Sequence, residues 1–176
     1  MKQEYRIDPA HSSAQFTVRH MMISNVRGAF SGIQGNVSYD PENVQATNMN
    51  VDIDASTVNT QDTQRDAHLK SAEFLDVSRF PTISFHSAKV EAVDGGELSI
   101  AGNLTIHGVT RQVILQVDPP SAEANDPWGN LRMGASATTR IKRSDFGLAW
   151  NQVLESGGIL VGDELKVGLD VSLIRA

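Results

Sequence analysis

An alternation of apolar residues with polar or small ones, repeating every two positions, runs through most of the chain. Successive side chains of a β-strand point to opposite faces, so this spacing is typical of strands that bury one face. It recurs in residues 14–20, 33–39, 48–54, 98–106, 113–117, 131–141 and 165–173. A further segment begins at Ile83 and Phe85 and changes phase near Ala88, which indicates a β-bulge. We therefore expect about eight strands.

The connections between these segments predict antiparallel pairing. The dipeptide His107-Gly108 separates two alternating segments and has the length of a two-residue hairpin turn. Such a turn pairs Ile106 with Val109 and places both on one face, as the alternation requires. Only residues 62–71 have a helical pattern, so the crossover helices that a parallel sheet needs are missing.

Strands with one apolar face must bury that face and protect the unpaired edges of their sheet. Closing the sheet into a barrel does both, and eight strands enclose room for packed side chains or for one small ligand. The inward faces include five small residues, which favour a cavity: Ala14, Gly35, Gly102, Ala135 and Ala137. A packed two-sheet sandwich is the alternative that alternation leaves open. The predicted fold class is all-β, a single antiparallel eight-stranded barrel with one short helix, and residues 1–176 form one domain.

Charge and composition argue against several classes of function. A net charge of −6 opposes nucleic-acid binding, which depends on Lys and Arg. The chain has no cysteine, so disulfides and thiolate chemistry are excluded. No stretch approaches the ~20 apolar residues of a membrane-spanning helix. The first residues have no apolar run typical of a secretory signal, and we expect the cytoplasm, or the periplasm if the chain is a mature form.

Short motifs follow one another along the chain: IDPAHS (7–12), FTVRH (16–20), GAF (28–30), RDAHLKS (65–71), FLDV (74–77), FPTISF (80–85), GNLTIHGVT (102–110) and RSDFGL (143–148). In content and order they resemble the signatures of the YceI-like family, over nearly the whole chain. The resemblance implies an extended lipocalin-like barrel that binds polyisoprenoid chains, such as a polyprenyl phosphate or a ubiquinone tail, with fatty acids or their amides as related ligands. The family is often exported, and the absence of a signal departs from that habit.

Two groups of mainly apolar residues are the candidates for contact with such a chain, with ordinary core packing as the alternative for each. The first group faces the barrel interior: Phe16, Val18, His20, Ile33, Val37, Met49, Val51, Phe85, Gly102, Leu104, Ile106, Leu115 and Met133. The second group would line the mouth or the covering helix: Phe30, Leu69, Phe74, Phe80, Phe146 and Leu148. Gly102 is a special case, because glycine in a strand contributes no packing. We expect a ligand chain to approach the wall there, with a bend or bulge as the competing explanation.

Polar candidates are fewer. Arg65, Asp66, His68 and Arg143 could recognise a head group, or could hold the helix and a loop in place as structural ion pairs. His20 continues an apolar face, and a buried histidine needs a hydrogen-bonding partner. The histidines lack the close spacing of a zinc motif, so we expect no metal and no cofactor.

The residues and the resemblance together indicate a lipid carrier whose partner is a long-chain isoprenoid or another lipid. Two rivals stay open: an enzyme that modifies an isoprenoid in the same cavity, and an interaction module whose barrel is filled by its own side chains. No Ser/His/Asp order or carboxylate pair predicts catalysis. Nucleic acid is not an expected partner, no membrane-spanning segment is expected, and a homodimer stays open.

Overall fold

The computed structural model describes residues 1–154 and 158–176, and its strands form one antiparallel sheet that closes on itself. Eight strands make the closed barrel, as the alternation predicts. These are β1 (Gln3–Ile7), β4 (Ile33–Tyr39), β5 (Asn48–Asp54), β6 (Thr82–Ala92), β7 (Leu98–Ile106), β8 (Val109–Val117), β10 (Leu131–Lys142) and β11 (Val161–Arg175). Three further strands join this sheet: β2 (Ser13–His20), β3 (Ser24–Phe30) and β9 (Ala124–Asn125).

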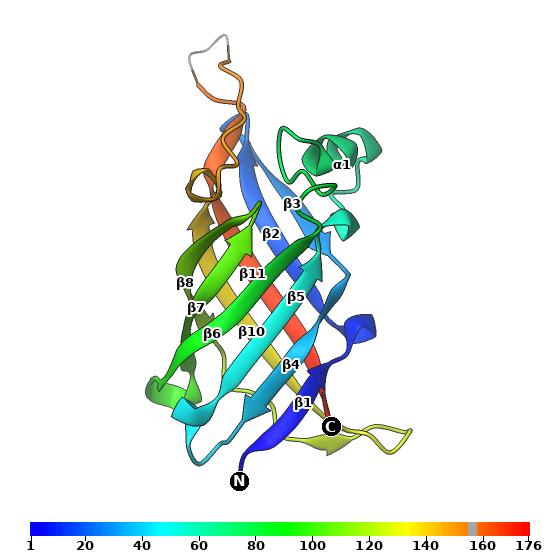
Figure 1. Cartoon of the computed structure of the whole chain (residues 1–176), viewed down its shortest axis with the longest axis vertical. Coiled ribbons are helices and arrows are strands. Elements are labelled where there is room, and N and C mark those ends of the chain that lie inside the picture. The colour runs from blue at the N-terminus through cyan, green and yellow to red at the C-terminus, as the bar shows by residue number, and fades with distance from the viewer. Residues whose placement is uncertain (155–157) are drawn as a thin grey trace.

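The long strand β11 closes the barrel. One edge of β11 pairs with β10 along almost its whole length. The other edge pairs with β1 near the C-terminus and with β2 over Val161–Asp170, so the β2–β3 hairpin extends the wall beyond β1. Figure 1 shows the resulting tall barrel. The end that carries both termini is called the lower end here, and the end near the β2–β3 turn is called the upper end.

The number of barrel strands is as predicted, but one member of the expected set differs. The alternation in residues 14–20 belongs to β2, which supplements the wall, whereas the place in the closed ring is taken by β1. β1 has only two buried apolar residues, Tyr5 and Ile7, and is too short for a clear alternation.

Three local predictions are confirmed. Ile106 pairs with Val109 across a two-residue turn in which His107 and Gly108 both have positive φ, 55° and 71°. The register of β6 on β7 shifts between Ser87 and Lys89, which is the expected bulge. The only α-helix among the described residues, α1, spans Thr63–Lys70 within the expected 62–71, and the carboxylate of Asp62 caps its first turn.

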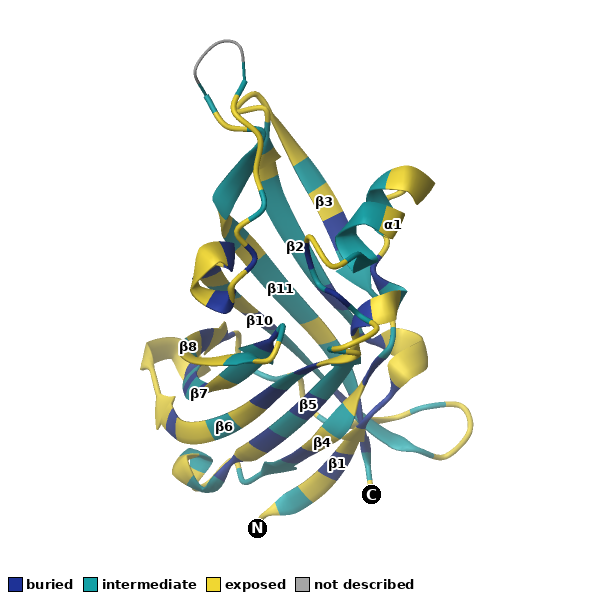
Figure 2. Cartoon of the chain, turned by 45° about the horizontal axis from the view of Figure 1, so that its top comes forward, coloured by how far each residue is buried: buried dark blue, intermediate teal, exposed yellow. Residues whose placement is uncertain are grey.

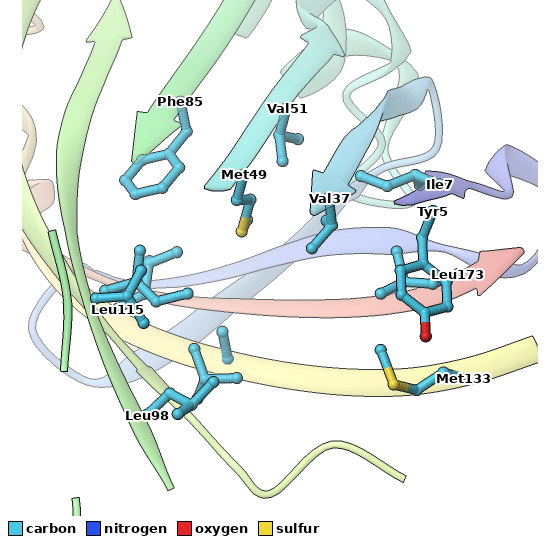
Figure 3. Close-up of a cluster of buried hydrophobic side chains, with 14 of the residues drawn as sticks. Tyr5, Ile7, Val37, Met49, Val51, Phe85, Leu98, Leu115, Met133 and Leu173 are labelled. Atoms are coloured by element: carbon cyan, nitrogen blue, oxygen red, sulfur yellow. The ribbon is translucent and has the colours of Figure 1, made fainter. Parts of the chain in front are cut away.

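The barrel interior holds two clusters of apolar side chains, one above the other. The lower cluster gathers residues of every barrel strand, including Tyr5, Val37, Phe85 and Leu173, which point into the barrel interior in Figure 3. The upper cluster contains Phe146, one of the most completely buried side chains. In Figure 2 buried residues alternate with exposed or partly buried ones along β4, β5 and β6, so each of these strands turns one face inward.

Candidate functional site

A cavity of about 160 Å³ lies in the upper half of the barrel, between β2, β3, β11 and the strands β5–β7. The helix α1 contributes Leu69 to its wall, and the segment after α1 contributes Phe74 and Leu75. The wall presents only apolar atoms to the interior. Such a space suits hydrocarbon and offers no partner to a polar group.

Nine of the predicted site residues line this upper cavity: Phe16, Val18, Phe30, Leu69, Phe74, Leu104, Ile106, Arg143 and Leu148. The prediction missed several others: Ala14, Gln15, Ile53, Val58, Leu75, Ile83, Ile141, Val161, Leu165 and Val167. Most of the missed residues lie on strands whose alternation had already marked their inward face. Val58 and Leu75 lie in irregular segments, where no periodicity could have identified them.

A second and smaller cavity, of about 50 Å³, lies in the lower half of the barrel. Val37, Met49 and Met133, all predicted to face the interior, line it. Thr47 also lines it, and the Thr47 hydroxyl is buried without a hydrogen-bond partner among the described residues.

A layer of side chains separates the two cavities. On β5 the upper cavity contacts Ile53 and the lower cavity contacts Met49, so Val51 lies between them. Val51 pairs with Phe85 on β6. The predicted residues that belong to the lower core cluster but line neither cavity are Ile33, Val51, Phe85 and Leu115. These side chains act as core. Val51 and Phe85 lie between the levels of the two cavities, in the layer that is called the floor here.

The structure corrects the interpretation of Gly102. A Cβ atom built on Gly102 would lie 2.4 Å from Cζ of Phe85 and 2.6 Å from the backbone oxygen of His86. The ring of Phe85 therefore takes the place that we expected a ligand to occupy. Gly102 pairs with Ser87 directly beside the bulge of β6. This position supports the competing explanation, in which a bend or bulge distorts the wall of the barrel.

Three more predicted contacts lie away from both cavities. His20 ends β2 and pairs with Val161 above the upper cavity. Phe80 packs against His107, with ring centroids 4.8 Å apart, so the His107 turn is partly covered. Phe146 is buried in the upper core cluster.

Arg65 and Asp66 hold the chain before α1 in place. Arg65 donates to the hydroxyl and the carbonyl oxygen of Thr60 at 2.8 and 2.7 Å. The Asp66 carboxylate accepts hydrogen bonds from the backbone N–H and the hydroxyl of the same Thr60. Both side chains therefore act in the structural role that was the alternative to head-group recognition.

His68 belongs to an aromatic group near the rim of the upper cavity. Its ring meets Phe74 and Trp150 edge-on, with centroids 4.9 and 4.7 Å away, and its Nε2 contacts the carboxylate of Glu73. Trp150 lies two residues after the end of the 143–148 motif, but a single tryptophan in a loop gave no signal in the sequence. Phe74 is at once part of this group and part of the cavity wall.

Arg143 is 5% exposed, and its guanidinium forms hydrogen bonds with the backbone. It donates to the carbonyl oxygens of Leu148, Trp150, Val161 and Gly162 at 2.6 to 3.1 Å. Desolvation lowers the pKa of Arg143, and the nearby charge of Asp163 opposes this effect. Because the cavity wall shows no polar atom, Arg143 contributes only its aliphatic part to the wall. The predicted head-group role gives way to that of a clamp between two rim segments.

The model of the YceI-like domain matches residues 5–173. The chain belongs to the YceI-like family. A protein named YceI from Salmonella newport is 40% identical over 147 residues, which cover 82% of this chain and 76% of the relative. The crystal structure of a Campylobacter jejuni YceI protein is 28% identical, covers 90% of each chain and has a TM-score of 0.74.

The YceI-like fold also extends to more distant structures. A domain from Saccharophagus degradans, described as polyisoprenoid binding, is 16% identical and covers 98% of both chains with a TM-score of 0.71. At this identity the likeness establishes the fold of the barrel alone.

Two further classes of site concern residues 1–154 and 158–176. In this part of the YceI-like chain, no group of three or more His, Asp or Glu side chains could hold a metal ion. No helix in the same residues has the length and hydropathy needed to cross a membrane.

Proposed function

We propose that this YceI-like protein carries a long-chain amphiphilic lipid, of which a polyisoprenoid is the favoured class, with hydrocarbon in the upper cavity. The observation that carries the proposal is the wholly apolar wall of that cavity. Burial of hydrocarbon contributes ~0.8 kcal/mol per methylene, so one five-carbon isoprene unit contributes roughly 3 kcal/mol before ordering costs. A few units are therefore sufficient for tight binding without a polar contact. The polyisoprenoid-binding domain from Saccharophagus degradans supports this class of ligand by its shared fold.

The volume of the upper cavity limits how much of such a ligand it can hold. An apolar cavity of ~150 Å³ holds one benzene molecule, and the upper cavity has about 160 Å³. It therefore accepts about one isoprene unit as it stands. The rest of a longer chain lies along the rim, or enters when the side chains of the floor move apart.

The polar end of the lipid stays outside the cavity in this proposal. The wall offers it no hydrogen bond, whereas the rim carries His68 and Trp150. An enzyme acting on the buried part of the chain would need a polar group in the wall, so a carrier role in transport, storage or protection fits the cavity better.

A cavity-filling variant tests this proposal. Val18→Phe adds a ring to the wall of the upper cavity, and Ile114→Phe adds the same ring on the outer face of β8, where Ile114 is exposed. We expect the purified protein to release a lipid on organic extraction, with the adduct visible in native mass spectrometry. Val18→Phe should lose most of the adduct, and Ile114→Phe should keep it.

Equal loads of lipid in the two folded variants would contradict the upper cavity as the binding site. Protein from lipid-replete cells that carries no adduct, and takes up no added polyprenol, would contradict the carrier role itself.

A further inference from the structure

Exposed apolar side chains gather at the upper end of the molecule. Five of the large exposed ones in the described residues lie there: Met21, Met22, Ile23, Val153 and Ile159. These five residues are called the apolar tip. The turn between β2 and β3 supplies the first three, and Ile23 is 74% exposed.

The two parts of the apolar tip lie side by side. The backbone N–H of Met21 donates to the carbonyl oxygen of Leu160 at 2.6 Å, and Val153 pairs with Ile159 in an isolated bridge. Figure 1 shows the β2–β3 turn and the segment before β11 together at the top of the barrel. A large exposed apolar patch marks a surface that contacts another molecule or a membrane.

The residues of the β2–β3 turn are unusual for a tight turn, but they are well suited to contact with an apolar surface. Met21 and Met22 have φ of 52° and 62°, a conformation that glycine and asparagine adopt at lower cost. Two methionines there accept backbone strain while presenting long, flexible apolar side chains to solvent.

The apolar tip continues into the wall of the upper cavity. Val161 lines the cavity and pairs with His20, the residue before Met21. Val18, which lies two residues before His20 on the same face of β2, also lines the cavity. An apolar path of a few residues therefore joins the exposed tip to the interior.

At the β2–β3 turn, the charged residues next to the apolar tip are positive, on a chain of net charge −6. Arg19 and Arg27 flank the turn, both are exposed, and neither forms an ion pair with a described residue. Residues 19–27 contain no Asp or Glu. Apolar side chains surrounded by cations match the surface of a bilayer that contains anionic lipid.

We propose that the apolar tip docks onto an anionic lipid bilayer, with its methionines and Ile23 in the interface and the two arginines at the phosphates. This surface does not depend on what the cavity holds. It gives the molecule a fixed orientation on the membrane, with the upper cavity directed toward the lipid and the termini directed away.

Vesicle co-sedimentation tests the proposal. The probes are phosphatidylcholine vesicles with and without phosphatidylglycerol. The test variant is Met22→Asn with Ile23→Ser, which removes two apolar side chains and places a residue that favours positive φ at position 22. The control is Trp128→Ser, because Trp128 is 79% exposed between β9 and β10, a segment that lies at the lower end of the barrel in Figure 1.

We expect the wild-type chain to bind the anionic vesicles, more weakly at high salt, and to bind the neutral vesicles less. The double variant should keep its melting temperature and weaken vesicle binding roughly tenfold or more. Trp128→Ser should bind as the wild type does. Val18→Phe should also bind as the wild type does, which separates this proposal from the function of the cavity.

Equal vesicle binding by the wild type and the folded double variant would overturn the proposal. So would the absence of binding to anionic vesicles. A concentration-dependent dimer that the double variant abolishes, without any vesicle binding by the wild type, would assign the tip to contact between copies of the chain.

Discussion

At Gly102 of β7 the wall of the barrel has no room for a side chain. The nearest obstacles are the Phe85 ring and a backbone oxygen, and the backbone cannot move aside without disturbing the sheet. We therefore expect Gly102→Ala to lower the free energy of unfolding by about 1–3 kcal/mol, through overpacking. Urea denaturation measures this loss.

Gly134 of β10 provides the matched control. A Cβ atom there would meet its nearest neighbour at 3.7 Å, an ordinary contact distance. Gly134→Ala should leave stability unchanged or raise it slightly, since alanine restricts the unfolded chain. If Gly102→Ala proved as harmless as Gly134→Ala, the close packing of Phe85 on Gly102 would be wrong.

Among the elements, the short helix η1 (Pro9–His11) is tied to the lower end of the barrel by charges. The carboxylate of Asp8, at the start of η1, accepts a hydrogen bond from Arg132 at 2.7 Å, and Arg132 also donates to Asp126 at 2.7 Å. The hydrogen bonds from Arg132 and His11 lower the pKa of Asp8 from 3.8 to about 2. Burial would raise the pKa of Asp126, but hydrogen bonds from Arg132 and Asn130 hold it well below its ordinary range.

These lowered pKa values predict the acid sensitivity of the barrel. A carboxyl whose pKa is lower in the folded state stabilises the fold above its unfolded pKa, and loses that contribution as the pH falls. We expect the free energy of unfolding to decrease between about pH 4 and pH 2, where Asp8 becomes protonated. Asp8→Asn should lower stability at neutral pH and make this decrease shallower. Asp94→Asn, in an exposed turn, should follow the wild-type profile, and an unchanged profile for Asp8→Asn would contradict the role of the network.

The elements that carry their own periodicity could be predicted from the sequence. Residues 98–106 alternate over their whole length, so both the strand and its inward face were predictable. β1 and β3 have few inward apolar residues, and their places are decided by pairing with distant strands. The role of β11 in closing two parts of the wall also depends on such long-range pairing, which no local pattern contains.

At the scale of the whole molecule, the sequence predicted the inward residues but not the division of the interior. An inward apolar side chain can pack as core or line a cavity, and alternation is the same in both cases. Leu104 and Phe85 are near neighbours on paired strands, yet Leu104 lines the upper cavity and Phe85 forms its floor. The ring of Phe85 packs against Gly102, a contact that only the assembled barrel defines.

This floor leads to a prediction about ligand length that rests on the proposed carrier function. Phe85→Leu removes the ring that separates the cavities of about 160 and 50 Å³, while a branched apolar side chain remains to support the core. We expect the variant to prefer longer chains than the wild type does when both are tested with isoprenoid alcohols of increasing length. Each further isoprene unit should raise affinity by at most about a hundredfold, the limit set by its burial. Met49→Ala enlarges the lower cavity but keeps the ring of Phe85, so its preferred length should equal that of the wild type. A folded Phe85→Leu variant with an unchanged preference would show that the chain never passes this layer.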